Sequence, residues 1–523
     1  MTIAEMLARN ARRYPDDLAL IELAPSRNLR RAITWREFDE RANRVAQALV
    51  ARGICKGDRV LHLLMNSINW LVAYFGIIRT GAWVVPLSFR FTERDIKYCA
   101  DIAEPRAMIL GEEFVERAKA VRPELSIEHY LFVGPDPPEG MESFEEALAA
   151  SRPDPVPVEL KDEDECGLYF TSGTTSAPKP ILLTHKNMEC AAITENVHHR
   201  QQHEDNFILI PPLYHTGAKM HWFGNLIVGG RATLLLEFSP RNLFEAVHRE
   251  RGTVVFLLVP WLHDVLQALD SGELRKEDYD LSCWRLTHIG AQPVPPSLVR
   301  RWKKYFPSMQ YDTNYGLSEA TGPGCVHLGI ENEHKLGAIG KPGFNWEARI
   351  VDDEGRDVPP GEVGELIVRG NGVMKGYYKN PERTGEVIRD GWLYTGDMAR
   401  KDEEGFIYLV DRKKDVIISG GENIYPVEVE EVLQGHPKVK DVGVIGLPDE
   451  RLGEIVTAVT EPKPGEKLTE EEIKAFCEQA LPRYKRPRLI IFDRVLRSPT
   501  GKIEKPRMRQ KYGGSARPFG LGE

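Results

Sequence analysis

The stretch Tyr169-Phe-Thr-Ser-Gly-Thr-Thr-Ser-Ala-Pro-Lys-Pro180 is the most informative part of this 523-residue chain. It follows the apolar run 166–170, which is typical of a buried strand. Lys179 adds a positive charge at the end of a hydroxyl-rich loop. The other polar loop residues and the glycine are Thr171, Ser172, Gly173, Thr174 and Thr175. Backbone N–H groups and hydroxyls in such a loop can wrap a polyphosphate, although a polar surface turn explains the local residues equally well.

Helical and strand patterns alternate on both sides of this loop. The capping box 34–37 predicts the start of an amphipathic helix. Helices are also predicted over 69–78 and 93–103. The predicted strands are 59–65, 82–87, 206–210, 232–236, 253–259 and 284–289. Repeated β-α-β units with continuous apolar strands indicate parallel sheets covered by helices.

The pattern changes after residue 348. Short strands separated by Asp/Glu-Gly turns indicate hairpins at 348–351, 364–368, 406–410 and 416–418. After residue 411 a separate α+β unit is predicted. Its helices are 426–434 and 469–480, and its strands are 442–446, 455–460 and 489–493. We therefore predict a domain boundary near residue 411.

Composition limits the class of protein. At about 150 residues per domain, the length predicts at least two domains. The net charge of −9, from 69 basic and 78 acidic residues, argues against nonspecific nucleic-acid binding by the whole chain. Seven scattered cysteines without a Cys-x-x-Cys pair favour a reducing cytosol. We expect no signal peptide and no integral membrane segment, and therefore a cytoplasmic location.

The loop is not a Walker A motif, because no Gly-Lys-Ser/Thr follows at the required spacing. It resembles instead the signature loop of the acyl-adenylate-forming superfamily, which includes acyl-CoA synthetases, nonribosomal peptide adenylation domains and beetle luciferases. The usual pattern is Thr-Ser-Gly-Thr-Thr-Gly-x-Pro-Lys-Gly. This chain departs from it at Ser176 and Pro180, where glycine is usual. Because proline restricts φ, we expect a stiffer loop.

Further blocks of that superfamily occur in the expected order, so the resemblance covers roughly residues 5–510. They are 211–217, 290–293, 314–320, 391–397, 408–415, 419–426 and 499–502. The resemblance implies an α/β fold with two domains. A large N-terminal domain (1–410) of helix-covered sheets, with a small β-barrel-like subdomain, would hold the nucleotide and the acid. A small, mobile α+β C-terminal domain (411–523) would follow, hinged near Lys414.

The resemblance also implies a two-step reaction. A carboxylic acid attacks the α-phosphorus of ATP, which forms an acyl-adenylate and releases pyrophosphate. CoA then takes the acyl group and AMP leaves. Because both reactants of the first step are anionic, catalysis depends on positioning and charge neutralisation. The implied cofactors are ATP, Mg²⁺ and coenzyme A.

The catalytic roles follow from matching positions. Lys502 would bridge the carboxylate and the α-phosphate, and Ser318 would hydrogen-bond the α-phosphate. Glu319 is the candidate metal ligand, because Mg²⁺ takes one or two carboxylates together with phosphate oxygens. His215 would lie beside the acyl pocket.

The binding roles are implied in the same way. The 171–179 loop with Lys179 would hold phosphates, and a lysine- and arginine-rich segment, 481–512, with a local balance of +9, would attract ATP and CoA. A solvated basic face is the alternative for most of that segment. The residues assigned to adenine are Gly290, Ala291, Gln292, Tyr315 and Gly316; those assigned to ribose are Asp397 and Arg412; those assigned to the pantetheine channel are Gly420 and Gly421.

The acyl substrate is the least determined feature. In relatives the pocket is lined by the segment after His215, here 216–222. Gly217 and Ala218 are small and leave space near the entrance of the acyl pocket. Lys219 is expected to lie outside the pocket, and the sequence does not decide whether His221 lines it. We favour a fatty or arylalkyl monocarboxylic acid. The expected partners are this acid, ATP and CoA, and we expect no binding of nucleic acid. The sequence is compatible with a homodimer.

Three alternatives share these motifs. The enzyme could load its acyl group onto a carrier protein, although no carrier-type Asp-Ser-Leu site follows Lys502. It could be a luciferase-like monooxygenase. It could be an inactive protein that keeps only the fold for binding; the intact Glu319, Asp397, Arg412 and Lys502 argue against this.

Overall fold

The apolar run before the predicted phosphate loop forms a strand in the middle of an eight-stranded sheet. The computed structural model describes residues 1–171, 178–322, 324–497 and 503–513. From β8 to β7 the sheet is parallel, β9 pairs antiparallel with β8, and β20 pairs antiparallel with β9. The strand order is β20 (Gly376–Tyr377), β9 (Lys179–Thr184), β8 (Glu165–Thr171), β4 (Trp83–Pro86), β3 (Arg59–Leu63), β5 (Ala107–Gly111), β6 (His129–Val133) and β7 (Glu142–Ser143).

The second large sheet has seven strands. All neighbours are parallel except the terminal pair β1–β2, which is a hairpin. The order is β14 (Gln310–Asp312), β13 (Leu286–Gly290), β12 (Val254–Leu258), β10 (Asn206–Leu209), β11 (Arg231–Leu235), β1 (Leu18–Ala24) and β2 (Leu29–Thr34). The predicted parallel sheets are thereby confirmed.

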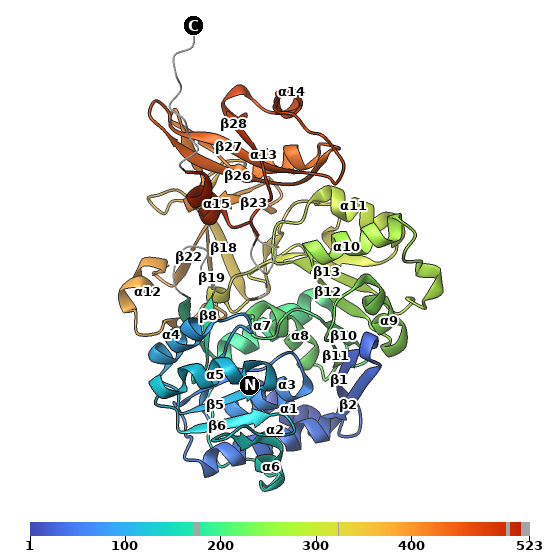
Figure 1. The fold of residues 1–523 in the computed structure, drawn as a ribbon, viewed down its shortest axis with the longest axis vertical. Coiled ribbons are helices and arrows are strands. Elements are labelled where there is room, and N and C mark those ends of the chain that lie inside the picture. The colour runs from blue at the N-terminus through green and yellow to red at the C-terminus, as the bar shows by residue number, and fades with distance from the viewer. Residues whose placement is uncertain (172–177, 323, 498–502, 514–523) are drawn as a thin grey trace. The chain divides into compact units, whose positions relative to one another are not determined.

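Helices connect and cover these strands, as Figure 1 shows. Thr34 and Glu37 form the predicted capping box of α2. Helix α3 is buried along its whole length, because it is apolar on every side. The helices of this part are α1 (Ile3–Arg13), α2 (Trp35–Ala51), α3 (Ile68–Arg79), α4 (Glu93–Ala103), α5 (Val115–Val121), α6 (Phe144–Ala149), α7 (His185–His199), α8 (Thr216–Leu226), α9 (Pro240–Glu250), α10 (Val259–Asp270), α11 (Pro296–Tyr305) and α12 (Pro381–Val387).

Short strands follow the second large sheet, and those after residue 348 include the predicted strands 348–351, 364–368 and 406–410. One three-stranded sheet has the order β15 (Asn314–Tyr315), β16 (Val326–His327) and β17 (Lys341–Pro342). A five-stranded sheet has the order β18 (Trp346–Val351), β19 (Gly364–Gly370), β22 (Trp392–Lys401) and β21 (Ile388–Arg389), with β23 (Ile407–Arg412) paired to β22.

The C-terminal part is α+β, as predicted. Its sheet has the order β25 (Glu422–Ile424), β24 (Ile417–Ser419), β27 (Gly453–Pro462) and β26 (Val439–Asp449), with β28 (Leu489–Phe492) paired to β27. Its helices, drawn in orange and red in Figure 1, are α13 (Pro426–Gln434), α14 (Glu470–Ala480) and α15 (Lys505–Tyr512). A core that includes Ile417, Val429, Leu433 and Val444 holds α13 on this sheet.

The chain divides by its contacts into two units. Among the described residues, the first unit contains 1–171, 178–348 and 368–393, and the second contains 349–367 and 394–513. The chain passes between them within β18, β19 and β22. The predicted boundary at 411 stays a prediction.

Among the described residues, no helix has both the length and the apolar character that a membrane span requires.

Candidate functional site

The predicted blocks of the first unit follow the carboxyl ends of parallel strands. The block that contains His215 comes after β10, 290–293 comes directly after β13, and 314–320 follows β14. These three strands are parallel members of one sheet. In open α/β sheets, ligands bind outside the carboxyl ends of such strands. The topology therefore collects three blocks at one edge.

The predicted phosphate loop connects two adjacent antiparallel strands. Thr171 ends β8 and Lys179 begins β9, and these two residues are paired across the hairpin. The pairing places Thr171, the first hydroxyl residue of the loop, directly opposite Lys179 in the neighbouring strand. The predicted residues Ser172, Gly173, Thr174 and Thr175 lie outside the described residues. Pro180 is accommodated within β9, opposite Phe170.

A tyrosine that the sequence did not single out connects two predicted site residues. The Tyr377 hydroxyl donates a hydrogen bond to Glu319 Oε1 at 2.9 Å. The Nζ atom of Lys179 lies 5.5 Å from the centre of the Tyr377 ring. Burial and the Glu319 carboxylate raise the pKa of Tyr377 above its usual value, so its hydroxyl keeps the proton that it donates. Strand pairing of Tyr377 with Ile181 on β9 places it there.

The Ser318 block is packed tightly against the start of α8. Thr216 Oγ1 and Ser318 Oγ lie 3.2 Å apart and form a hydrogen bond. A Cβ atom added to Gly316 would come within 1.8 Å of the Gly322 carbonyl oxygen. Gly322 itself has φ +105° and lies against the backbone of Gly217. Glycine at 316 is therefore required by a close backbone approach.

The adenine block contains a residue with unusual backbone geometry. Gly290 is the last residue of β13, and Ala291 follows with φ +69°. A positive φ is uncommon for a residue with a Cβ atom and costs conformational energy. Ala291 is exposed and Gln292 is half-buried, while Tyr315 on β15 is buried. The ring of Tyr315 is thus largely covered by protein.

Lys219, which the sequence analysis expected outside the acyl pocket, is buried inside the protein. His215 caps α8, and Lys219 lies one turn later in the same helix with none of its surface exposed. Its Nζ atom donates to the carbonyl oxygens of Leu213 at 3.3 Å and His215 at 3.4 Å. It also lies 4.4 Å from the centre of the Tyr169 ring. Because burial removes the ammonium from water, the pKa of Lys219 is lowered well below its usual value.

His221, which the sequence left open, is also buried. Its Nδ1 atom lies 2.8 Å from Glu195 Oε2. Although burial alone would raise the pKa of Glu195, the neighbouring His221, His199 and His327 hold it below its usual value. His221 therefore belongs to a polar network inside the protein, and the segment 216–222 is less apolar than a purely hydrophobic pocket requires.

In the second unit, the two residues predicted for ribose face each other. Asp397 and Arg412 are paired across β22 and β23, and Arg412 Nε lies 2.6 Å from Asp397 Oδ1. Asp397 is largely buried, whereas about half of the Arg412 side chain is exposed. The Asp397 carboxylate can accept hydrogen bonds from vicinal hydroxyls, and the exposed Arg412 guanidinium can donate hydrogen bonds to them.

The predicted hinge and pantetheine residues also lie in the second unit. Lys414 is exposed in a short 3-10 helix, Lys413–Asp415. Gly420 and Gly421 form the turn between β24 and β25 with φ +61° and +87°. An added Cβ atom at Gly421 would meet nothing within 4 Å, so open space adjoins this turn.

Ion pairs connect helix α15 to α13 and to the predicted hinge block. Lys505 Nζ lies 3.2 Å from Glu430 and 3.5 Å from Asp411, and Arg509 lies 2.8 Å from Asp415. Although burial alone would lower it, Glu430 and Asp411 raise the pKa of Lys505. The predicted catalytic Lys502 lies outside the described residues, three positions before Lys505.

The interpretation of 481–512 as a strongly basic segment needs correction. Several of its cations are paired with acids that lie elsewhere in the sequence, which the local balance of +9 omitted. These pairs are Lys485–Glu428, Arg486–Glu478, Arg497–Asp441, Lys505–Glu430 and Arg509–Asp415. The field of this segment is therefore weaker than its own composition indicates.

Comparisons with known proteins place most of the chain in one family. Residues 7–378 match the family described as AMP-binding enzyme, and residues 428–502 match the AMP-binding enzyme C-terminal domain. The chain is 36% identical to a feruloyl-CoA synthase of Amycolatopsis sp., over 92% of this chain and 94% of the relative. It is 31% identical to a long-chain-fatty-acid–CoA ligase of Mycobacterium tuberculosis, over 98% of both. The crystal structure of ATP-bound MatB from Rhodopseudomonas palustris superposes with a TM-score of 0.89 at 28% identity, over 99% of this chain and 100% of that one.

Proposed function

The chain belongs to the AMP-binding enzyme family, and we propose that it is an AMP-forming acid–thiol ligase. It activates a carboxylic acid with ATP to an acyl-adenylate, with release of pyrophosphate. It then transfers the acyl group to CoA, which gives acyl-CoA and AMP. The observation that carries this proposal is the arrangement of three motif blocks at the carboxyl ends of parallel strands, within a chain that matches the family over residues 7–378.

For the first step, the first unit supplies the groups that bind phosphate and metal. Lys179 neutralises the phosphates together with the loop 171–177, and Ser318 hydrogen-bonds the α-phosphate. Glu319 binds Mg²⁺, which neutralises charge on the triphosphate when it is bound. The hydrogen bond from Tyr377 to Glu319 supports this assignment, because it holds the carboxylate in one orientation. His215 lies at the acyl side of the reaction.

The same proposal assigns residues to the adenosine moiety of ATP. Gly290, Ala291, Gln292, Tyr315 and Gly316 contact the adenine. Asp397 and Arg412 bind the ribose hydroxyls, and the charged pair that they form at 2.6 Å supports this. Lys502 bridges the carboxylate and the α-phosphate in the transition state of adenylation.

The second step requires a different arrangement of the same groups. We assign the hinge to Lys414, between a domain of residues 1–410 and a mobile domain of residues 411–523. Gly420 and Gly421 line the path of the pantetheine thiol. Their turn with positive φ and open space beside Gly421 supports a close approach of a ligand to backbone.

The acid is a fatty or arylalkyl monocarboxylic acid. Support comes from two relatives, whose names specify a feruloyl and a long-chain fatty acyl group. The enzyme acts in the cytoplasm and needs no nucleic acid, and a homodimer is compatible with the proposal.

A panel of acids assayed for pyrophosphate release, with and without CoA, tests the function. Fatty, aryl, dicarboxylic and amino acids are compared at equal concentration with ATP and Mg²⁺. We expect acid-dependent pyrophosphate release with a monocarboxylic acid and formation of its CoA thioester. Release without any thioester, together with transfer to a phosphopantetheinylated carrier protein, would identify a carrier-loading enzyme. The absence of release with every acid would contradict the proposal.

A further inference from the structure

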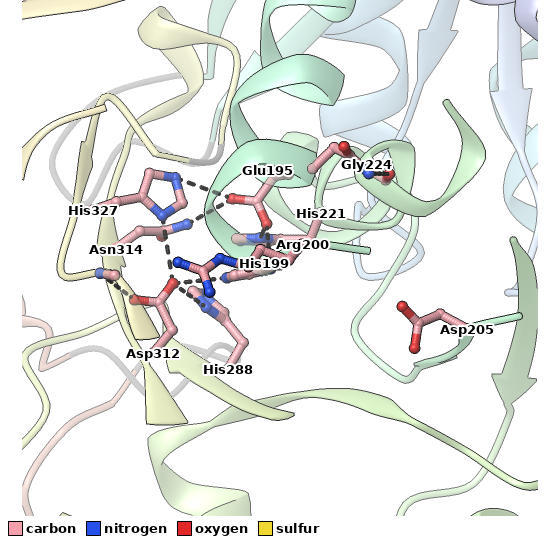
Figure 2. Close-up of polar contacts among 12 residues, drawn as sticks. Glu195, His199, Arg200, Asp205, His221, Gly224, His288, Asp312, Asn314 and His327 are labelled. Atoms are coloured by element: carbon pink, nitrogen blue, oxygen red, sulfur yellow. Dashed lines mark hydrogen bonds and ion pairs between the residues drawn. The ribbon is translucent and has the colours of Figure 1, made fainter. Parts of the chain in front are cut away.

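Six buried side chains in the first unit form a histidine–carboxylate cluster that has no role in the two-step reaction (Figure 2). They come from α7, α8, β13, β14 and β16, and each is 0–3% exposed. The members are Glu195, His199, His221, His288, Asp312 and His327. Such a concentration of imidazoles and carboxylates away from water requires a physical explanation, because buried charges are normally paired or bind metals.

Three imidazole rings converge on one carboxylate oxygen. Asp312 Oδ2 lies 2.7 Å from His199 Nε2, 3.4 Å from His327 Nδ1 and 3.5 Å from His288 Nδ1. The donor atoms of His199, His288 and Asp312 all lie within 4.8 Å of one another. In a tetrahedral zinc site with bonds of about 2.0–2.1 Å, neighbouring donor atoms are about 3.3 Å apart. The distances from Asp312 Oδ2 to the three ring nitrogens, 2.7–3.5 Å, lie on both sides of that value.

A second carboxylate contacts the outer nitrogens of two of these rings. Glu195 Oε2 lies 3.2 Å from His199 Nδ1, and Glu195 Oε1 lies 3.3 Å from His327 Nε2. Metal-binding histidines usually place their other ring nitrogen against a carboxylate, which sets the tautomer and the ring orientation. Glu195 is itself held by Asn314 Nδ2 at 2.9 Å and by His221 Nδ1 at 2.8 Å.

The hydrogen bonding within the cluster is incomplete. The backbone N–H of Gly329 donates to Asp312 Oδ1 at 2.9 Å, which leaves Oδ2 for the rings. Among the residues that the structure describes, both nitrogens of His288 lack a hydrogen bond of normal geometry, as do His199 Nδ1 and His327 Nε2. Buried polar atoms are rarely left in this state. His288 Nδ1, which faces Asp312, therefore has coordination capacity that protein atoms do not use, whereas His199 Nε2 and His327 Nδ1 are hydrogen-bonded to Asp312 Oδ2.

We propose that His199, His288 and Asp312 bind one divalent transition-metal ion, for which Zn²⁺ is the best match. Imidazole nitrogen with a single carboxylate suits Zn²⁺, whereas Mg²⁺ selects oxygen donors. The ion would also balance the two buried carboxylates. Because all three ligands are fully buried, we assign the metal a structural role, separate from the Mg²⁺ assigned to Glu319.

The position of this site connects it to the nucleotide-binding blocks. His288 is the middle residue of β13, two residues before Gly290, and Asp312 is the last residue of β14, three residues before Tyr315. An ion held by both residues would fix these two paired strands relative to each other. Loss of the ion should therefore loosen the segments that follow, and with them ATP binding.

The metal content of the full-length enzyme tests the proposal directly. Protein made without a histidine tag in zinc-supplemented medium is desalted and analysed by inductively coupled plasma mass spectrometry. We expect about one zinc per chain. After removal by a chelator, added Zn²⁺ should raise the midpoint of thermal unfolding, because a ligand bound only to the folded state stabilises it. Added Co²⁺ should produce the intense visible absorption of a tetrahedral site. Less than about 0.1 zinc per chain, with no response to Zn²⁺ or Co²⁺, would overturn the proposal and leave a metal-free ionic network.

Variants separate this site from adventitious binding. His288→Ala and Asp312→Asn should each lose the bound zinc, while His129→Ala, which removes a half-buried histidine on β6, should keep it. Glu195→Gln should still bind one zinc but about 10–100-fold more weakly, as expected for a residue that orients ligands. Should the first two variants not fold, Glu195→Gln and the unmodified enzyme decide the question. Zinc retained equally by all variants would exclude these ligands.

Discussion

Tyr377 donates a hydrogen bond of 2.9 Å to Glu319 although 58 residues separate them in the chain. The Lys179 ammonium lies on the ring of the same tyrosine. Tyr377 thus touches both the residue assigned to the metal and the residue assigned to the phosphates, through two different parts of its side chain.

Tyr377→Phe removes only the hydroxyl and should weaken the use of Mg²⁺. A group that orients a metal ligand typically contributes a factor of about 10–100 in affinity or activity. We expect the Mg²⁺ concentration for half-maximal pyrophosphate release to rise by about tenfold or more. Tyr378→Phe is the matched control, because the ring of Tyr378 packs against Trp83. Equal Mg²⁺ dependence in both variants would refute the role of Tyr377.

Asp397→Asn should raise the KM for ATP by about 10–100-fold. A hydrogen bond to a charged group is worth about 1.5–3 kcal/mol, and the substitution also weakens the ion pair with Arg412. The loss should largely disappear when 2′,3′-dideoxy-ATP replaces ATP, because the ribose hydroxyls are then absent. Glu461→Gln, which disrupts the exposed pair with Lys440, is the control. A defect that is independent of the nucleotide's hydroxyls would place Asp397 elsewhere in the mechanism.

Gly316→Ala should destabilise the first unit and impair adenylation. The new Cβ atom would overlap the Gly322 carbonyl oxygen, and such overpacking costs about 1–3 kcal/mol. Gly217→Ala is the control for stability, because a Cβ atom there meets nothing within 4 Å. Thermal unfolding followed by circular dichroism compares the two. A Gly316→Ala protein as stable as the Gly217→Ala protein would contradict the close approach.

Lys219→Met should stabilise the protein and change how stability depends on pH. Because the pKa of Lys219 is lowered on folding, the unfolded chain binds more protons below pH 10.5, and stability rises as pH increases toward that value. Removing this group should add about 1–3 kcal/mol near neutral pH, and the difference from the unmodified enzyme should shrink as pH approaches 10.

Denaturant unfolding at several pH values measures this difference. Lys186→Met, which removes an exposed lysine, is the control and should change stability only slightly. A Lys219→Met protein that is less stable at every pH would show that the hydrogen bonds of Nζ to the two carbonyl oxygens outweigh the cost of burial.

Lys502→Ala should abolish acyl-adenylate formation while largely sparing thioester formation from preformed acyl-adenylate. The reason is that the ammonium is needed only where carboxylate and α-phosphate meet. Arg507→Ala, at an exposed position of the same segment, should affect neither step. Rapid-quench measurement of each half-reaction makes the comparison. Equal loss of both steps in Lys502→Ala would refute the assignment.

Features that depend on a few neighbouring residues were predictable. Helix α4 has the predicted bounds 93–103, and α13 has the predicted bounds 426–434. Capping residues and apolar periodicity act within one or two turns, so the sequence contains the whole cause. The order of the motif blocks likewise determined the family, which the comparisons confirm.

Features that depend on which strands become neighbours were not predictable. The sequence placed Lys219 outside the acyl pocket, and only the tertiary packing shows that it is buried against the ring of Tyr169. The balance of +9 in 481–512 counted charges within a window, whereas Glu428, Glu430 and Asp441 reach that segment only through the fold.

By itself, the sequence determined the periodic elements, the family and the chemistry of each motif, since these follow from local residue types and their order. Only the tertiary structure decided that Tyr377 meets Glu319 and that His199, His288 and His327 surround Asp312. The physical reason is that burial and the pairing of strands distant in the sequence set the surroundings of a side chain. Those surroundings decide whether a lysine is charged and whether a group of histidines can bind a metal ion.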